Sequence, residues 1–176
     1  MEQAIKNLMK EKFLVISVVV LMLGSCSPNK ESYFDFDQVD YYSIKKDNKE
    51  FRERYDCNTG VESEDFGCDI VNSYRPTSIG DTTFIDSLVH LNYSKTELDS
   101  AKFDDLRLIF SVTDPPFVNT YNACAPIYRD ILIFKKRNKI TGMAKICFEC
   151  EQHYIVGSNI PRVESFDFAG LGNILY

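Results

Sequence analysis

The sequence of 176 residues has no tryptophan, only two histidines, and no apolar run long enough to cross a bilayer. Its longest apolar stretch, residues 13–23, reaches about half of the roughly 20 residues that a spanning helix needs. A glycine-rich phosphate loop, a nucleophile elbow and a metalloprotease helix are also missing from the sequence. These absences exclude a stable transmembrane anchor in that stretch and several common enzyme classes, and they favour a protein without catalytic activity.

An excess of positive charge is missing too. The whole chain carries a net charge of −6, and residues 1–25 hold three lysines against two glutamates, so residues 26–176 carry −7. Such an acidic chain repels phosphate backbones and anionic headgroups. We therefore expect no nucleic-acid partner, and we expect that any stable contact with a membrane depends on a covalent lipid.

The aromatic residues that are present are 13 phenylalanines and 10 tyrosines, which favour strands over a helical bundle. Residues 33–176 are numerous enough for one domain with a hydrophobic core. The sequence predicts an α+β class, with a single small domain built around an antiparallel β-sheet.

The start of the chain combines a basic stretch, a short apolar stretch and a cysteine. Lysines in residues 1–12 precede the apolar residues 13–23, which is the layout of a secretory signal. Leu23-Gly24-Ser25-Cys26 then gives an aliphatic residue, two small residues and a cysteine. This order resembles the lipobox of bacterial lipoproteins; an ordinary signal peptide followed by a chance cysteine is the alternative.

The lipobox resemblance implies that residues 1–25 are removed as a signal peptide and that Cys26 is acylated, with palmitate among its chains. A second buried acyl chain turns reversible membrane binding into stable anchoring. Ser27, rather than aspartate, follows the cysteine. In lipoproteins of many two-membrane bacteria this arrangement directs the protein to the outer membrane. Residues 26–32 are polar and are predicted to form a short lipidated tether.

The clearest structural pattern lies in residues 130–148. An apolar strand, a polar turn at 136–139 and a returning apolar strand predict a β-hairpin. Weaker patterns predict a strand at 33–44, an irregular surface segment at 56–81, a strand or helix at 82–91 and 103–111, a helix cap at 96–99, and packing of 160–176 against the sheet.

Five cysteines follow Cys26, and an exported protein meets oxidants that can pair them. Because five is odd, at most two bridges form within the chain and one thiol is left over. Cys57 and Cys68 enclose a polar segment, and a bridge between them would stabilise the fold by about 3 kcal/mol. The acidic side chains of this segment follow no recognisable calcium-loop spacing.

The other three cysteines, Cys124, Cys147 and Cys150, should gather at the open end of the hairpin, because a turn centred on Asn138 brings Cys124 near Cys150. His153 follows closely. Three hypotheses compete: a disulfide from Cys124 to Cys147 or Cys150, a zinc site of three sulfurs and the imidazole of His153, and redox cycling of the Cys147–Cys150 pair. Zinc is the only cofactor that the sequence suggests.

The segment from Cys124 to Cys150 also resembles a motif of small bacterial proteins, in which a cysteine-containing loop leads into an apolar strand and the hairpin ends in Ile-Cys-Phe-x-Cys. Those proteins have no established activity, so the resemblance implies no function.

Overall fold

The computed structural model describes residues 31–45, 66–72, 74–112, 124–159 and 167–176. These residues belong to one compact unit that begins at Glu31. The predicted leader, residues 1–25, lies outside the described residues, as do residues 26–30. Ser32, which the sequence assigns to the tether, forms an antiparallel bridge with Ser111. None of the helices in the described part of the chain has the length and apolar character needed to span a bilayer.

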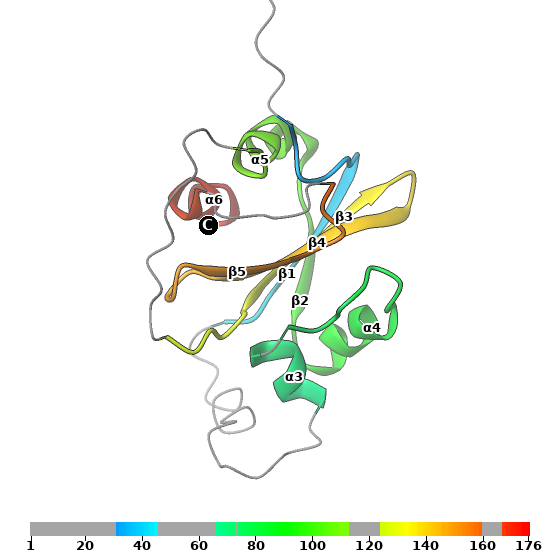
Figure 1. The fold of residues 1–176 in the computed structure, drawn as a ribbon, viewed down its shortest axis with the longest axis vertical. Helices are drawn as coiled ribbons and strands as arrows, with labels where there is room; N and C mark the ends of the chain where they lie inside the picture. Colours follow the sequence, from blue (N-terminus) through cyan, green and yellow to red (C-terminus); the bar gives the residue numbers. More distant parts are fainter. Residues whose placement is uncertain (1–30, 46–65, 73, 113–123, 160–166) are drawn as a thin grey trace, which may run out of the picture. The chain divides into compact units, whose positions relative to one another are not determined.

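Five antiparallel strands form one sheet in the order β2-β1-β3-β4-β5 (Figure 1). The strands are β1 (Gln38–Ser43), β2 (Ser94–Glu97), β3 (Asp130–Lys136), β4 (Lys139–Cys147) and β5 (Gln152–Val156). Helices pack on this antiparallel sheet, so the predicted α+β class with a single small domain is confirmed.

β3 and β4 form the predicted hairpin. Asp130 pairs with Ile146 at the open end, and Lys136 pairs with Lys139 beside the turn. The two turn residues, Arg137 and Asn138, have φ angles of 49° and 62°. A two-residue turn with both φ angles positive matches the right-handed twist of the strands, and asparagine tolerates this conformation well. The polar turn expected at 136–139 is therefore where the sequence placed it.

The sheet has two apolar faces, because successive side chains of a strand point to opposite sides. One face, called here the α5/α6 face, is covered by α5 (Phe103–Ile109) and α6 (Phe168–Leu175). The opposite face, called here the α3/α4 face, is covered by α3 (Phe66–Asn72) and α4 (Thr83–His90). Figure 1 shows the two helix pairs on opposite sides of the sheet.

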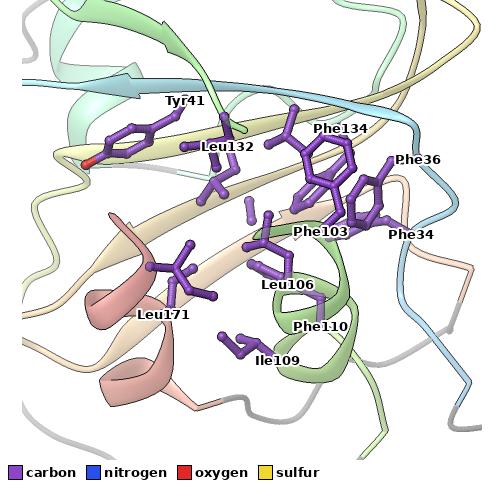
Figure 2. Close-up of a cluster of buried hydrophobic side chains, with 14 of the residues drawn as sticks. Phe34, Phe36, Tyr41, Phe103, Leu106, Ile109, Phe110, Leu132, Phe134 and Leu171 are labelled. Atoms are coloured by element: carbon purple, nitrogen blue, oxygen red, sulfur yellow. The ribbon is translucent and has the colours of Figure 1, made fainter. Parts of the chain in front are cut away.

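Aromatic side chains dominate the core of the α5/α6 face, as Figure 2 shows. The ring of Phe34 stacks on Phe134 with the centroids 4.2 Å apart, and Phe110 meets Phe134 edge-on at 5.1 Å. Phe34 also covers Gly142 of β4, where an added methyl group would overlap its ring. Leu171 of α6 completes the cluster from the other side.

Several expectations for the shorter elements need correction. Residues 66–72, expected to be irregular, form α3. β2 and β5 were not predicted; β2 is wholly exposed and polar, so it carries no apolar alternation. Only residues 38–43 of the strand expected at 33–44 join the sheet.

Other expectations are resolved by the structure. Residues 83–90 and 103–109 are helices rather than strands. Asp99 caps a short 3₁₀ helix, η1 (Ser100–Lys102), by accepting a hydrogen bond from the backbone N–H of Ala101 at 2.9 Å. The C-terminal segment packs on the sheet through α6, as expected.

Candidate functional site

The open end of the β3–β4 hairpin holds three cysteines. Cys124 precedes β3, and Cys150 lies in the turn between β4 and β5. The two form a disulfide with their Cα atoms 5.8 Å apart. This is one of the two pairings that the sequence left open for Cys124. The bridge joins the segment before β3 to the turn after β4, and thus closes the open end of the hairpin.

Cys147 is the last residue of β4 and carries a free thiol. Its side chain lies on the α3/α4 face and is only 2% exposed. Cys147, Cys150 and Tyr128 form a small buried cluster of their own, beside the larger cores. The leftover thiol that cysteine counting predicts is therefore packed next to the Cys124–Cys150 bridge.

His153 does not join this cluster. In the β4–β5 register Cys147 pairs with Gln152, whereas His153 pairs with Ile146. Because alternate residues point to opposite faces, His153 lies on the α5/α6 face, where its ring approaches Phe168 with the centroids 6.0 Å apart. The four predicted zinc ligands are thus not brought together. In the described segments, no group of three or more histidine, cysteine, aspartate or glutamate side chains is arranged to hold a metal.

Lys145 lies two residues before Cys147, on the same face of β4, and is completely buried. Its ammonium group donates a hydrogen bond to the carbonyl oxygen of Arg75 at 2.9 Å. The Nζ atom also lies 4.6 Å from the ring centroid of Tyr128 and 5.7 Å from that of Tyr154. Burial lowers the pKa of Lys145 to about 7, against a smaller opposing effect of the Asp69 charge.

The segment 74–76 covers Lys145. Arg75 forms an ion pair with Asp69 of α3 at 3.0 Å, and its peptide bond to Pro76 is cis. Tyr154 donates a hydrogen bond from its hydroxyl to the carbonyl oxygen of Pro76 at 2.9 Å, and its ring meets Tyr74 edge-on. One carbonyl oxygen and two aromatic rings thus surround the amine of Lys145 and stabilise it in place.

A second polar cluster surrounds Asp130 on the α5/α6 face. The hydroxyls of Tyr41 and Tyr176 both donate to one carboxylate oxygen of Asp130, at 2.5 and 2.7 Å. Burial raises the pKa of Asp130, and the two hydrogen bonds oppose that rise. Tyr176 is exposed at its surface, but partial burial of its hydroxyl and the contact with Asp130 raise its pKa to about 12, so the hydroxyl keeps its proton at neutral pH.

A third cluster joins three strands. Asp40 of β1 is 1% exposed and forms ion pairs with Lys95 of β2, at 2.9 Å, and with Lys135 of β3. Burial raises the pKa of Asp40, but the hydrogen bonds and charges of the two lysines outweigh it and hold that pKa below its usual value. This network stabilises the sheet rather than forming a reactive centre, because both cations are engaged with one carboxylate.

The sequence did not single out Lys145, Asp130 or Asp40. A signal for Lys145 existed, since it interrupts an apolar strand on the same face as Met143 and Cys147. The structure describes only one of the three remaining predicted cysteines. Cys68 is bonded in a disulfide, while its predicted partner Cys57 and the lipidation site Cys26 lie outside the described residues.

No protein-family model, no curated protein and no solved structure matches this chain.

Proposed function

We propose that this chain is an exported bacterial lipoprotein of the cell envelope, anchored through lipid on Cys26, and that its domain has a structural or binding role rather than a catalytic one. The observation that carries the proposal is the Cys124–Cys150 disulfide at the end of the hairpin. Disulfides of this kind persist in oxidising compartments and are rare in the cytoplasm. The bridge therefore agrees with the export signal that the sequence predicts in residues 1–25.

The chemistry of the described side chains supports a role without catalysis. The amine of Lys145 is buried and is engaged with a carbonyl oxygen and aromatic rings of the same domain. The hydroxyls of Tyr41 and Tyr176 are likewise engaged, with Asp130. Groups used in this way stabilise the fold, and the disulfide adds about 3 kcal/mol by limiting the unfolded chain.

Metabolic labelling with a palmitate analogue tests the anchor. The full chain, expressed in a two-membrane bacterium, should take up the label and should begin at Cys26 by intact mass. The matched variant Cys26→Ala should lose the label and leave the membrane fraction or retain residues 1–25. An unlabelled wild-type chain that keeps its first 25 residues in the cytoplasm would contradict the proposal.

The identity of residue 27 allows the destination to be tested separately. We propose that the wild-type chain is found in the outer membrane, because serine rather than aspartate follows Cys26. In a density-gradient separation, Ser27→Asp should shift the labelled chain to the inner-membrane fraction while labelling itself is unchanged. Recovery of the labelled wild-type chain in the inner-membrane fraction would remove the outer-membrane assignment but keep the lipid anchor.

Zinc at Cys124, Cys147, Cys150 and His153 stays an alternative hypothesis, although the structure bonds Cys124 to Cys150 and places His153 on the opposite face of the sheet. Metal analysis of the full chain, purified without chelators, tests it directly. One equivalent of bound zinc that is lost in Cys147→Ala would support the site.

A further inference from the structure

Three sulfur atoms, those of one disulfide and one free thiol, lie at the open end of the β3–β4 hairpin. Cys150 is bonded to Cys124 and belongs to the same buried cluster as the free thiol of Cys147. Only Phe148 and Glu149 separate Cys147 from Cys150 in the sequence. The sulfur of Cys150 thus has one covalent partner and a second thiol close by.

We propose that Cys147 exchanges with the Cys124–Cys150 disulfide, so that the bridge alternates between Cys124–Cys150 and Cys147–Cys150. In the first state the free thiol is buried at Cys147. In the second state it is at Cys124, which is exposed. The domain then presents a thiol at its surface that the first state lacks.

The exchange is balanced without an outside oxidant or reductant. The thiol of Cys147 loses its proton to water, and the thiolate attacks the Sγ atom of Cys150. The new Cys147–Cys150 sulfur–sulfur bond forms as the Cys124–Cys150 bond breaks. Cys124 leaves as a thiolate and takes up a proton from water. Among these three cysteines, one disulfide and one thiol are present before and after the step.

Cys150, rather than Cys124, is the sulfur open to attack. Cys150 is 5% exposed and packs in the cluster with Cys147 and Tyr128, whereas Cys124 lies outside that cluster on the surface. The exchange therefore runs through Cys150 as the shared sulfur and produces the CxxC pair.

The segment that carries Cys124 has contacts that do not depend on the bridge. Gln152 donates a hydrogen bond from its side-chain amide to the carbonyl oxygen of Cys124 at 3.1 Å. The backbone N–H of Tyr128 donates to Val71 at 2.8 Å, and the hydroxyl of Tyr93 donates to the carbonyl oxygen of Tyr128 at 2.6 Å. These contacts hold the released Cys124 near Cys150, so the exchange is reversible.

Peptide mapping separates the two states. Lys145 and Arg162 are trypsin sites that leave Cys147 and Cys150 on one peptide, while the peptide of Cys124 ends at Arg129. The first state gives two peptides joined by a disulfide. The second gives a single peptide with an internal bridge, two hydrogens lighter than its reduced form, and a separate Cys124 peptide.

The experiment uses the full chain, purified in detergent without reductant. Thiols are trapped with N-ethylmaleimide in the folded protein before acid denaturation and digestion. We expect maleimide on Cys124 together with the internally bridged Cys147–Cys150 peptide, and the amount should rise with the time of trapping. The control Cys147→Ala should lose the Cys124 label. A wild-type chain labelled at no cysteine until it is unfolded, and then only at Cys147, would overturn the proposal, as would equal Cys124 labelling in Cys147→Ala.

A second variant keeps the test independent of any folding defect in Cys147→Ala. Cys124→Ala removes the exposed cysteine, and we expect it to form the Cys147–Cys150 bridge while its circular dichroism matches that of the wild type. Recovery of Cys147 and Cys150 as two free thiols in a folded, air-oxidised Cys124→Ala protein would also refute the exchange. Both readouts concern sulfur connectivity alone, so they are independent of where the chain is anchored.

Discussion

At the scale of single residues, Lys145 combines full burial with a charge-bearing group. Its folded pKa of about 7 lies below the value of 10.5 for a solvated lysine. Between these two pH values the unfolded chain holds a proton that the folded chain has released. The free energy of unfolding should therefore rise with pH in this window, by up to about 1.4 kcal/mol per pH unit for this one group.

The substitution Lys145→Met tests this linkage. Methionine is unbranched like lysine, one atom shorter, and cannot be protonated. The rise in stability between about pH 7.5 and 9.5 should therefore be smaller in the variant than in the wild type. Urea titrations at a series of pH values measure the free energy of unfolding of each protein. Lys139→Met is the matched control, because it makes the same substitution at an exposed position of the same strand. Parallel profiles for the wild type and Lys145→Met would show that burial does not perturb this amine.

The sequence predicted the approach of Cys124 to Cys150 for a physical reason. The position of a polar turn determines which residues of a hairpin face each other. Two residues that are equally far from the turn along the chain lie opposite each other across the hairpin. His153 was grouped with these cysteines because it is near them in sequence. That grouping fails because β5 begins at Gln152, and strand alternation then sends His153 to the opposite face of the sheet.

At the scale of secondary-structure elements, β4 depends on a glycine. The side chain that a larger residue would place at Gly142 meets the ring of Phe34 and the carbonyl oxygen of Val156. Val156 belongs to β5, and Phe34 packs on the sheet, where it is stacked on Phe134. Close packing of this kind leaves no room for even one methyl group.

Two glycine-to-alanine substitutions should therefore act in opposite directions. Gly142→Ala should lower the free energy of unfolding by about 1–3 kcal/mol, because Phe34 must move out of its stack. Gly172→Ala, in helix α6, should raise it by up to about 1 kcal/mol, because alanine favours a helix and the nearest side-chain atom is at ordinary contact distance, 3.7 Å. Thermal and urea unfolding of both variants provide the comparison. If Gly142→Ala is as stable as Gly172→Ala, the packing described for Phe34 is wrong.

Elements with a strong apolar pattern were predictable, and those without one were not. The β3–β4 hairpin has long apolar runs on both sides of a polar turn, so its type and bounds follow from the sequence. β2 has four exposed residues and is held in place by pairing with β1 and by the ion pair between Lys95 and Asp40. α3 has seven residues, and its position follows from packing of Ile70 and Val71 on the sheet, which no local pattern reveals.

At the scale of the whole domain, two cores share one sheet. The α5/α6 face and the α3/α4 face each bury a separate cluster of apolar side chains, and β1, β3 and β4 contribute to both. Removing support from one face exposes strands on which the other face depends. Unfolding of the domain should thus be one cooperative transition. The two apolar cores supply most of the stability, and the disulfide increases it further.

Reduction of the full chain tests how much the fold depends on its bridges. With reductant present the melting temperature should fall, while a single cooperative transition remains. Each opened bridge, Cys124–Cys150 and that of Cys68, removes about 3 kcal/mol of a stability that rests mainly on the two cores. The double variant Cys124→Ala/Cys150→Ala should melt below the oxidised wild type without reductant, and reductant should shift it less than it shifts the wild type. Circular dichroism and differential scanning calorimetry follow both transitions. Loss of all cooperative unfolding on reduction would mean that the bridges, rather than the two apolar faces, define the folded state.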